Sequence, residues 1–512
     1  MLIVQNSHQQ YQKFVETYLD TLYIQTNQHI TLFKKQSYIL KFWSADLTGI
    51  VHVLKPYYSQ ATVGVPPKDA VALLRSLLLM SEVGITSISK WVSELRATPI
   101  YAIISGFIPA CCKPSDYNNY FNSIPGVGTF YDFMKKLIRY DKKLHKSKYK
   151  KFKLKPKKKQ KKNQKANEPK STLSERLVKR VLKYGDSKLP DTIESTLNLV
   201  LKEVFVKPSL AVGLLGNINK LNVAADGTLV STSGSPYGKK VCNCKLKPGE
   251  KCNCRRKFTD PDAAWGWDSF HEVYVYGHTF HGFTTCDSKY DLPLHLKSVS
   301  AARHDSVTGI FHLKEFVDLY SQDIKINSAA YDSAYDCTYF YILNNNYDIA
   351  PVIDLNRRKS LNPEGEDPLV VYNDNGKPYT KACSKPLRNW GLISKSFRRK
   401  FLFPVQCDSC NKCDIDSKKI HYQKLSDNPR LFCKIERGSD QWKARYTRRS
   451  TTERMWDRLK NDFNANHCTV FSRELITIRL FLGAFCSYID SWAKESKITL
   501  FDIFPSLIAV AA

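Results

Sequence analysis

The sequence Leu221-Asn-Val-Ala-Ala-Asp-Gly-Thr228 decides the fold that we expect for this chain. A short apolar run that ends in Asp-Gly is typical of a buried strand that stops and turns at the acid. The sequence Ile326-Asn-Ser-Ala-Ala-Tyr-Asp332 repeats this pattern directly before a helix-like segment. Acids at the strand ends of an alternating strand and helix chain point into the crevice at the sheet edge. Asp226 and Asp332 are therefore candidate metal ligands, although a single Asp-Gly more often marks an ordinary turn.

The segments around these two runs follow the order of an α/β domain. The expected strands are 221–226, 271–276, 279–285, 294–300, 326–331 and 349–355, and the expected helices are 310–320 and 334–343. Three antiparallel strands followed by alternating helix and strand predict a mixed sheet with helices on both faces.

The stretch Tyr446-Thr-Arg-Arg-Ser-Thr-Thr-Glu-Arg-Met-Trp-Asp-Arg-Leu-Lys460 predicts a helix with an unusual polar face. Tyr446, Arg449, Glu453 and Lys460 lie at i, i+3, i+7 and i+14, positions that share one side of a helix. A carboxylate can hold Mg²⁺ while Arg and Lys neutralise phosphate oxygens. Most charged helices simply present such a face to water. The stretch therefore indicates a metal site only in combination with the two aspartates. Three carboxylates can hold two divalent cations for phosphodiester cleavage.

These motifs together resemble those of DDE transposases of bacterial insertion sequences, in the group with a Tyr-(2)-Arg-(3)-Glu-(6)-Lys signature. The four-residue signature fits without a gap, and it is more specific than either aspartate motif. Asp226 stands in an Asp-Gly-Thr context and Asp332 in an Asp-x-x-Tyr-Asp context, where Asp336 is an alternative second acid. By resemblance, the metal ligands are Asp226, Asp332 and Glu453, and the residues that contact DNA are Tyr446, Arg449 and Lys460.

The resemblance implies an RNase H-like catalytic domain with inserted segments and two Mg²⁺ ions, for which Mn²⁺ may substitute. It implies a transposase that binds terminal inverted repeats, cleaves DNA and joins the freed end to a target. Because two ends must be held together, we expect a homodimer on DNA. Two other classes remain open: an RNase H-like nuclease that cuts without joining, and a non-catalytic DNA-binding descendant of a transposase. Intact acids at all three places disfavour the second.

Composition agrees with a nucleic-acid partner. The chain has 512 residues, 43% of them apolar, with 78 Lys and Arg against 48 Asp and Glu. The net charge of +30 favours a polyanion, with nucleic acid ahead of an anionic membrane. No N-terminal segment resembles a secretion signal, and the apolar stretch 475–489 is too short to span a bilayer. We expect a cytoplasmic, nucleoid-associated protein that binds double-stranded DNA and no membrane.

The chain divides by composition into five parts. A helix at 68–82, a turn at Gly84 and a second helix capped by Thr86 outline a helix-turn-helix, although an ordinary helical hairpin is about as common. The expected parts are an all-helical DNA-binding domain at 1–140, a lysine-rich linker at 141–172, a helical connector at 173–215, a catalytic domain at 216–480 with Cys-rich inserts at about 237–265 and 357–440, and a C-terminal tail at 481–512.

Two groups of cysteines have the composition of structural zinc sites, because zinc prefers four thiolate or imidazole ligands in a closed site. For both groups a reduced, metal-free loop is the alternative. The candidate ligands are Cys242, Cys244, Cys252 and Cys254 in the first group, and Cys407, Cys410 and Cys433 with either Cys413 or His421 in the second.

Three weaker patterns have two interpretations each. The run 255–257, Arg-Arg-Lys, could line a DNA channel, although short basic runs usually face solvent. Trp265 and Trp267 could stack on unpaired bases, although burial against the sheet is the safer expectation. The pair His304-Asp305 could assist the acids, although a satisfied surface pair is the simpler expectation.

Overall fold

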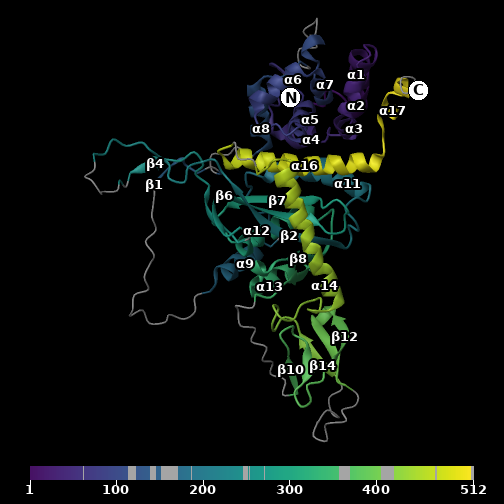
Figure 1. Cartoon of the computed structure of the whole chain (residues 1–512). Coiled ribbons are helices and arrows are strands. Elements are labelled where there is room, and N and C mark those ends of the chain that lie inside the picture. The colour runs from purple at the N-terminus through teal and green to yellow at the C-terminus, as the bar shows by residue number, and fades with distance from the viewer. Residues whose placement is uncertain are drawn as a thin grey trace.

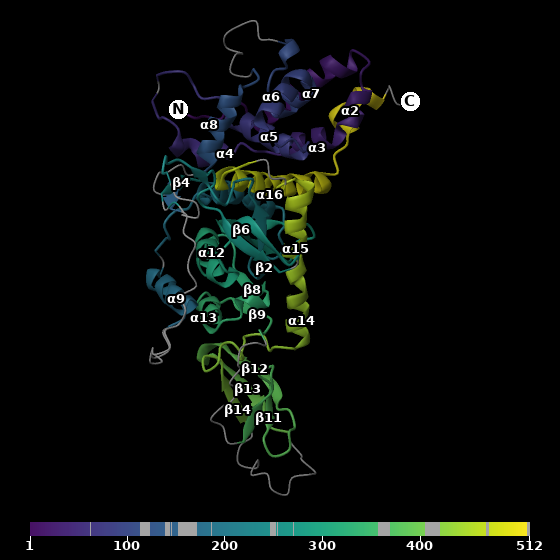
Figure 2. The same cartoon turned by 60° about the vertical axis from the view of Figure 1, so that its left-hand side comes forward.

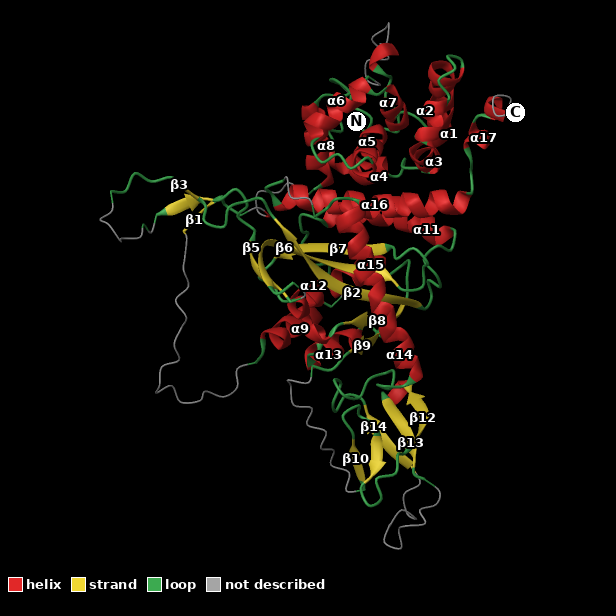
Figure 3. Ribbon diagram, viewed as in Figure 1, coloured by secondary structure: helices red, strands yellow, loops and turns green. Residues whose placement is uncertain are grey.

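The computed structural model describes residues 1–508 except residues 62, 113–122, 139–143, 145, 152–170, 186, 246–251, 253, 270, 357–368, 405–419 and 467–469. Helices of the N-terminal region lie at one end, a mixed sheet lies in the middle, and a small group of strands lies at the other end (Figure 1). Helices also surround the sheet, as the colouring by secondary structure shows (Figure 3). The predicted α/β class with a mixed sheet is confirmed.

The largest sheet among the described residues has six strands. Its path is β5-β6-β2-β8-β9, and β7 also pairs with β6. The pairs of β6 with β2, β5 and β7 are antiparallel, whereas β2, β8 and β9 run parallel. The strands expected at 271–276 and 279–285 are one long strand, because Gly277 stays in the ladder opposite Ser231. The strands are β2 (Leu221–Ser231), β5 (Ala264–Asp268), β6 (Val273–Thr285), β7 (Pro293–Ser300), β8 (Ile326–Tyr331) and β9 (Ala350–Ile353).

We expected strand β2 to end at Asp226, but it continues to Ser231. Asp226 pairs with Gly282 of β6, so the Asp-Gly dipeptide lies inside an antiparallel ladder. Gly227 is required for space, because a Cβ at this position would collide with the carboxylate of Asp305. The turn preference of Asp-Gly is local, and the pairing with β6 overrides it.

Helices cover both faces of the sheet (Figure 2). The helices concerned are α9 (Leu173–Tyr184), α12 (Asp305–Tyr320), α13 (Thr338–Asn346) and α15 (Ser450–Asp457). On one face the ring of Phe316 in α12 stacks on Phe283 of β6 at 4.5 Å. On the other face, Met455 and Trp456 of α15 leave no room for a side chain at Gly282. Because neighbours in a strand point to opposite faces, α12 and α15 sandwich the sheet between them.

The described secondary structure up to residue 137 is mainly helical. They are α1 (His8–Leu19), α2 (Ile30–Lys34), α3 (Gln36–Ser44), α4 (Ile50–Leu54), α5 (Ala70–Glu82), α6 (Ile88–Ala97), α7 (Pro99–Ser105) and α8 (Val127–Leu137). Helix α5 is buried from Ala70 to Ser81, whereas α6 exposes Lys90 and Arg96. The cap of α6 is Ser87 and not Thr86, since the Ser87 hydroxyl accepts the N–H of Lys90 at 3.4 Å.

Helix α16 (Arg473–Ser496) lies between the N-terminal helices and the sheet (Figure 1). The thiol of Cys486 contacts the Leu78 carbonyl of α5, and the Tyr488 hydroxyl donates to the Pro293 carbonyl of β7 at 2.8 Å. The boundary that we placed at 480/481 falls inside this helix. Among the described helices, α16 alone has the length and apolarity to cross a membrane, but 78% of its most apolar window is buried, as in a core helix.

Two smaller sets of strands flank this body. Tyr149–Lys151, inside the expected linker, forms a strand that pairs with the basic run 255–257, whereas residues 152–170 lie outside the described part. Five strands lie in the insert expected at 357–440. The smaller strands are β1 (Tyr149–Lys151), β3 (Lys239–Lys240), β4 (Arg255–Lys257), β10 (Val370–Tyr372), β11 (Pro378–Thr380), β12 (Arg388–Ile393), β13 (Arg398–Leu402) and β14 (Ile420–Lys424), and the remaining α-helices are α10 (Ser195–Val200), α11 (Lys207–Ala211), α14 (Asp440–Tyr446) and α17 (Leu500–Ile503).

Candidate active site

Asp226 and Asp332 lie side by side at one edge of the central sheet. Strands β2 and β8 are parallel, with Ala224 opposite Ala330, and each aspartate follows two residues later. Neighbouring strands are about 4.8 Å apart, so aligned residues lie close together. The carboxylate of Asp226 accepts the Gly227 N–H at 2.8 Å, and that of Asp332 accepts an N–H of the following turn at 2.9 Å. The two acids singled out in the sequence therefore meet.

A third carboxylate, Asp305, joins them. Asp305 is the first residue of α12, and its carboxylate packs against Gly227, next to Asp226. The charge of Asp332 acts on both other acids. The surface role that we preferred for Asp305 is wrong; its neighbour His304 is the helix cap, and its ring accepts the Ser306 N–H at 3.3 Å. The sequence signal that could have identified Asp305 is its position as an acid at the start of a helix that begins near the other two acids.

Burial raises the pKa values of all three acids, and the charge of Asp332 adds to this effect at Asp226 and Asp305. Burial and the charge of Asp332 raise the pKa of Asp226 to about 7. The same two causes raise the pKa of Asp305 to about 6, and burial raises that of Asp332. A bound cation would reverse these shifts by favouring the ionised forms. Hard carboxylate oxygens are the donors that Mg²⁺ and Mn²⁺ prefer, so the residues fit such an ion.

Glu453 reaches the same edge of the sheet from helix α15. The guanidinium of Arg449 bridges two acids, with Nη2 2.7 Å from Glu453 Oε1 and Nη1 3.4 Å from Asp226 Oδ2. The indole N–H of Trp456 donates to the backbone carbonyl of Asp226 at 3.4 Å, which ties α15 to β2. Asp332 also acts on the charge of Arg449. The structure thus gathers Asp226, Asp332 and Glu453 around one arginine.

The predicted helix at 446–460 is confirmed as a continuous helical run, but it is not regular. A 3₁₀ turn at Thr447–Arg449 and a π turn at Arg458–Asp462 flank α15. Tyr446 stacks on Trp442 with ring centres 4.8 Å apart, and burial together with the charge of Asp354 raises its pKa. Lys460 lies on the π turn, where burial lowers its pKa and the nearby charges are Asp268 and Asp457. Tyr446 therefore adjoins the acids, and Lys460 lies further along the helix.

Asp332 and Asp336, the two candidates for the second acid, have different surroundings in the structure. Asp336 is fully buried and accepts hydrogen bonds from the Arg430 guanidinium at 2.6–2.9 Å. It also accepts from the Tyr341 hydroxyl at 3.2 Å and from the Asn356 N–H at 2.8 Å. Asp336 is thus committed to the core, and Asp332 is the acid at the sheet edge.

A buried chain of hydrogen bonds underlies the acids. The Tyr335 hydroxyl bonds to His281 Nε2, His281 Nδ1 lies 2.5 Å from His312 Nδ1, and His312 Nε2 lies 2.6 Å from His295 Nδ1. If Tyr335 donates to His281, each ring donates onward with every imidazole neutral. Burial lowers the pKa of His281 to about 3, in agreement with neutral rings. This network fixes the strand next to Asp226 and was not foreseen from the sequence.

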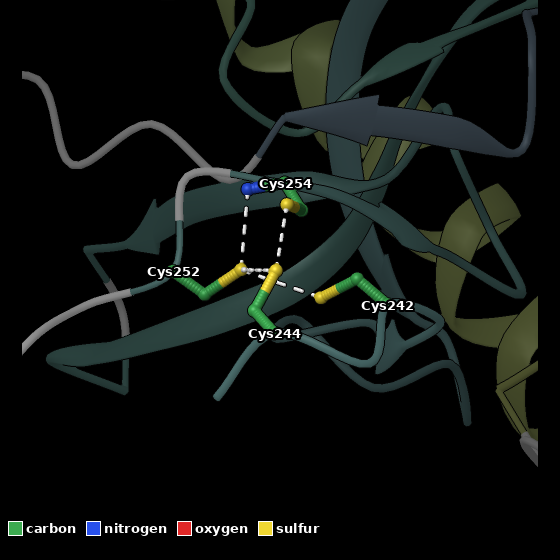
Figure 4. Close-up of side chains that lie close together, drawn as sticks. All are labelled: Cys242, Cys244, Cys252 and Cys254. Carbon is green, nitrogen blue, oxygen red and sulfur yellow. Dashed lines mark hydrogen bonds between the residues drawn. The ribbon is translucent and has the colours of Figure 1, made fainter. Parts of the chain in front are cut away.

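The first cysteine group converges, as the sequence predicts (Figure 4). Cys242 and Cys252 have sulfurs 3.3 Å apart, as do Cys244 and Cys254, and all four sulfurs lie within 4.8 Å of one another. A zinc ion with four thiolates requires sulfurs roughly 3.8 Å apart. A disulfide needs about 2.05 Å. The four residues can therefore bind a metal such as zinc.

The second cysteine group is described only in part. Cys407, Cys410 and Cys413 lie outside the described residues. Cys433 is buried, and its sulfur contacts the Arg437 guanidinium at 3.6 Å, while His421 Nε2 lies 2.9 Å from the Tyr372 hydroxyl.

We expected Trp265 and Trp267 to be buried against the sheet, but they are not. Their side chains on edge strand β5 are 50% and 52% exposed. Each contacts a tyrosine of β6, with ring centres 5.3 Å apart for Trp265 and Tyr276 and 4.8 Å apart for Trp267 and Tyr274. Because β5 pairs on one side only, its aromatic rows remain open to solvent.

The acid site combines three partly buried aspartates, the exposed carboxylate of Glu453, a bridging arginine and an adjacent phenol. No protein-family model and no curated protein matches this chain. Its function is therefore inferred from the site itself.

Proposed function

We propose that this chain is a DNA transposase that cleaves DNA at the ends of a mobile element and joins the freed end to a target. The observation that carries the proposal is the meeting of Asp226, Asp332 and Glu453 at one sheet edge. Each of these residues lies more than a hundred positions from the next one in the sequence. Asp332 repels Asp226, and Glu453 is linked to Asp226 through their shared partner Arg449. Carboxylates held together against repulsion are typical of functional sites.

The strand order supports an RNase H-like catalytic domain. Strands β7, β6 and β2 form the antiparallel half and β2, β8 and β9 the parallel half, with α12 and α13 in the crossovers. This is the order that we expect for such a domain. The first two acids stand on its two central strands, and the third arrives on a helix after the insert.

Asp226, Asp332 and Glu453 would hold two Mg²⁺ ions, which supply an activated water and a Lewis acid for the leaving oxygen. The residues of the chain have separate tasks. Arg449 balances Asp226 and Glu453, and once a cation takes that task its guanidinium is free to pair with a phosphate in bidentate fashion. Tyr446, next to Arg449, would contact the same DNA backbone. Lys460 would contact DNA further along the helix.

DNA binding in this proposal extends beyond the acids. Helix α6 exposes Lys90 and Arg96 and would read the terminal inverted repeat, with the buried α5 as its support. Two ends must be held together for joining, so a homodimer on DNA is part of the proposal. A cytoplasmic, nucleoid-associated location goes with it.

The proposal is tested with a plasmid that carries the reading frame's own flanking DNA, supplied with purified protein and Mg²⁺. We expect excised ends and joined product on a gel, and no reaction with Asp332→Asn or Glu453→Gln. The matched control is Asp457→Asn, since this exposed carboxylate lies one turn beyond Glu453 in the same helix. It should react as the unaltered protein does.

Three results would contradict the proposal. Cleaved ends without joined product would favour an RNase H-like nuclease. DNA binding without any cleavage, by a protein with its acids intact and Mg²⁺ or Mn²⁺ present, would favour a non-catalytic descendant. Full activity of Asp332→Asn would show that the acids are not the reacting centre.

A further inference from the structure

A small sheet to the side of the main body consists almost entirely of basic residues (Figure 1). We call β1, β4 and β3 the cationic ribbon, after their order in this sheet. Seven of its eight residues are Lys or Arg, and the eighth is Tyr149. Neither the acid site nor the helices of the N-terminal region involves this ribbon.

The ribbon is unfavourable as an isolated structure. Its register aligns Lys150, Arg256 and Lys240 in one row across three strands, and Lys257 with Lys239 in the next. Like charges directly opposite each other destabilise a strand pair. Strands of two or three residues also have too few ladder hydrogen bonds to hold by themselves. Another interaction must therefore hold the ribbon together.

The four converging cysteines lie in the connection between β3 and β4. Cys242 follows β3 by two residues, and Cys254 directly precedes β4. A zinc ion on these thiolates would close the connection and pin the two strands. Four thiolates and one Zn²⁺ also carry a net negative charge, which offsets part of the repulsion among the basic residues. The metal would thus act on both weaknesses of the ribbon.

The cations on one face of the ribbon donate hydrogen bonds to backbone carbonyls of the protein. The Lys150 ammonium donates to the Pro261 carbonyl at 2.9 Å and lies 4.5 Å from the ring centre of Phe258. Arg256 donates to the Tyr237 carbonyl at 3.2 Å. Lys240 donates to the Cys244 carbonyl at 3.4 Å, within the metal loop. These three cations belong to the row that faces the chain.

The opposite face is open. Lys239, Arg255 and Lys257 are exposed, and none of them has an ion pair or a side-chain hydrogen bond within the described part of the chain. Tyr149 stands in the same row as Lys257 and is 47% exposed. The row contains no aliphatic side chain that would enter a bilayer. Lys239 and Lys257 are opposite each other on neighbouring strands, about 4.8 Å apart, and Arg255 lies two residues from Lys257 along β4, so the three cations can contact several phosphates together.

We propose that the cationic ribbon binds the phosphodiester backbone of DNA without reading its sequence, and that zinc on the four cysteines holds it in the binding form. The choice of DNA rests on the proposed function, whereas the metal dependence stands on the ribbon itself. In the sequence, strand β1 is followed directly by the lysine-rich stretch 152–170.

The test compares salt dependence of binding to a random-sequence duplex by fluorescence anisotropy, without Mg²⁺ so that no cleavage intervenes. The slope of log K against log salt is negative. We expect the triple variant Lys239→Gln/Arg255→Gln/Lys257→Gln to reduce its magnitude by about 2.7, at about 0.9 for each lost phosphate contact. A matched control is Lys34→Gln/Lys220→Gln/Lys325→Gln, which removes three exposed cations elsewhere, and it should keep the slope.

The metal arm uses the unaltered chain and Cys242→Ser/Cys252→Ser. We expect zinc in the unaltered protein by elemental analysis, one zinc ion fewer per chain in the variant, and a slope reduced as in the ribbon variant. Zinc added to chelator-treated protein should restore the slope, and Mg²⁺ should not. An unchanged slope in the ribbon variant, or in zinc-free protein, would overturn the proposal. So would ribbon-dependent binding to phosphatidylserine vesicles that exceeds binding to DNA. A reduced slope in a protein that never cleaves DNA would support the ribbon and refute the transposase.

Discussion

Replacement of Asp226 by asparagine is expected to stabilise the protein in chelator while abolishing its response to Mg²⁺. The pKa of Asp226 rises from its ordinary 3.8 to about 7 in the fold. The folded state therefore binds more protons than the unfolded state between these values, so stability falls as pH rises and the loss is complete above pH 7. This difference between the two pKa values corresponds to a loss of about 4 kcal/mol in the free energy of unfolding at pH 8. The pKa of about 7 already includes the lowering effect of Arg449. Asparagine has the same shape and no charge, so it removes this loss.

Denaturant unfolding at pH 8 and pH 5 measures the effect. In chelator, Asp226→Asn should exceed the unaltered protein by about 4 kcal/mol at pH 8 and by under about 2 kcal/mol at pH 5. Millimolar Mg²⁺ should stabilise the unaltered protein, because the ion binds only the folded acids, and it should not stabilise Asp226→Asn. Asp457→Asn, which alters an exposed acid of helix α15, should behave as the unaltered protein does. A loss of stability in Asp226→Asn at pH 8, or an equal gain at both pH values, would refute the electrostatic account of the site.

Three further predictions concern the surroundings of the acids. Gly227→Ala should cost about 1–3 kcal/mol in denaturant unfolding, because its Cβ overlaps the Asp305 carboxylate, and Asp305→Ser should restore part of that stability in the double variant. Because the pKa of His281 is lowered to about 3 in the fold, the unfolded state takes up the extra proton on acidification; stability should therefore fall below pH 6.5 by up to about 1.4 kcal/mol per pH unit, and His281→Gln should reduce this slope. Arg430→Ala should cost about 3–5 kcal/mol in thermal or denaturant unfolding, since it removes the cation that pairs with the buried charge of Asp336, whereas Arg430→Ala/Asp336→Ala should cost clearly less.

Much of the central sheet follows from the sequence because its signals are local. The apolar runs at 221–225 and 326–331 are buried strands, and the acid after each run lies at the predicted sheet edge. The spacing of Arg449 and Glu453 places both on one side of a helix because helical periodicity depends only on neighbouring residues. The convergence of the first cysteine group also follows from short spacing, since a loop of this length brings its ends together at little entropic cost.

What only the tertiary structure decides are contacts between residues far apart in the chain. Nothing near Asp305 in the sequence indicates that its carboxylate packs on Gly227, and nothing near Asp336 indicates that Arg430 neutralises it. The turn preference of Asp-Gly is overridden by the pairing with β6, in which Asp226 lies opposite Gly282, a residue 56 positions later in the sequence. In each case a local preference is weaker than the burial and pairing energies that long-range contacts supply. The sequence by itself determined the candidate acids, whereas the packing of β2, α12 and α15 decided which of them meet.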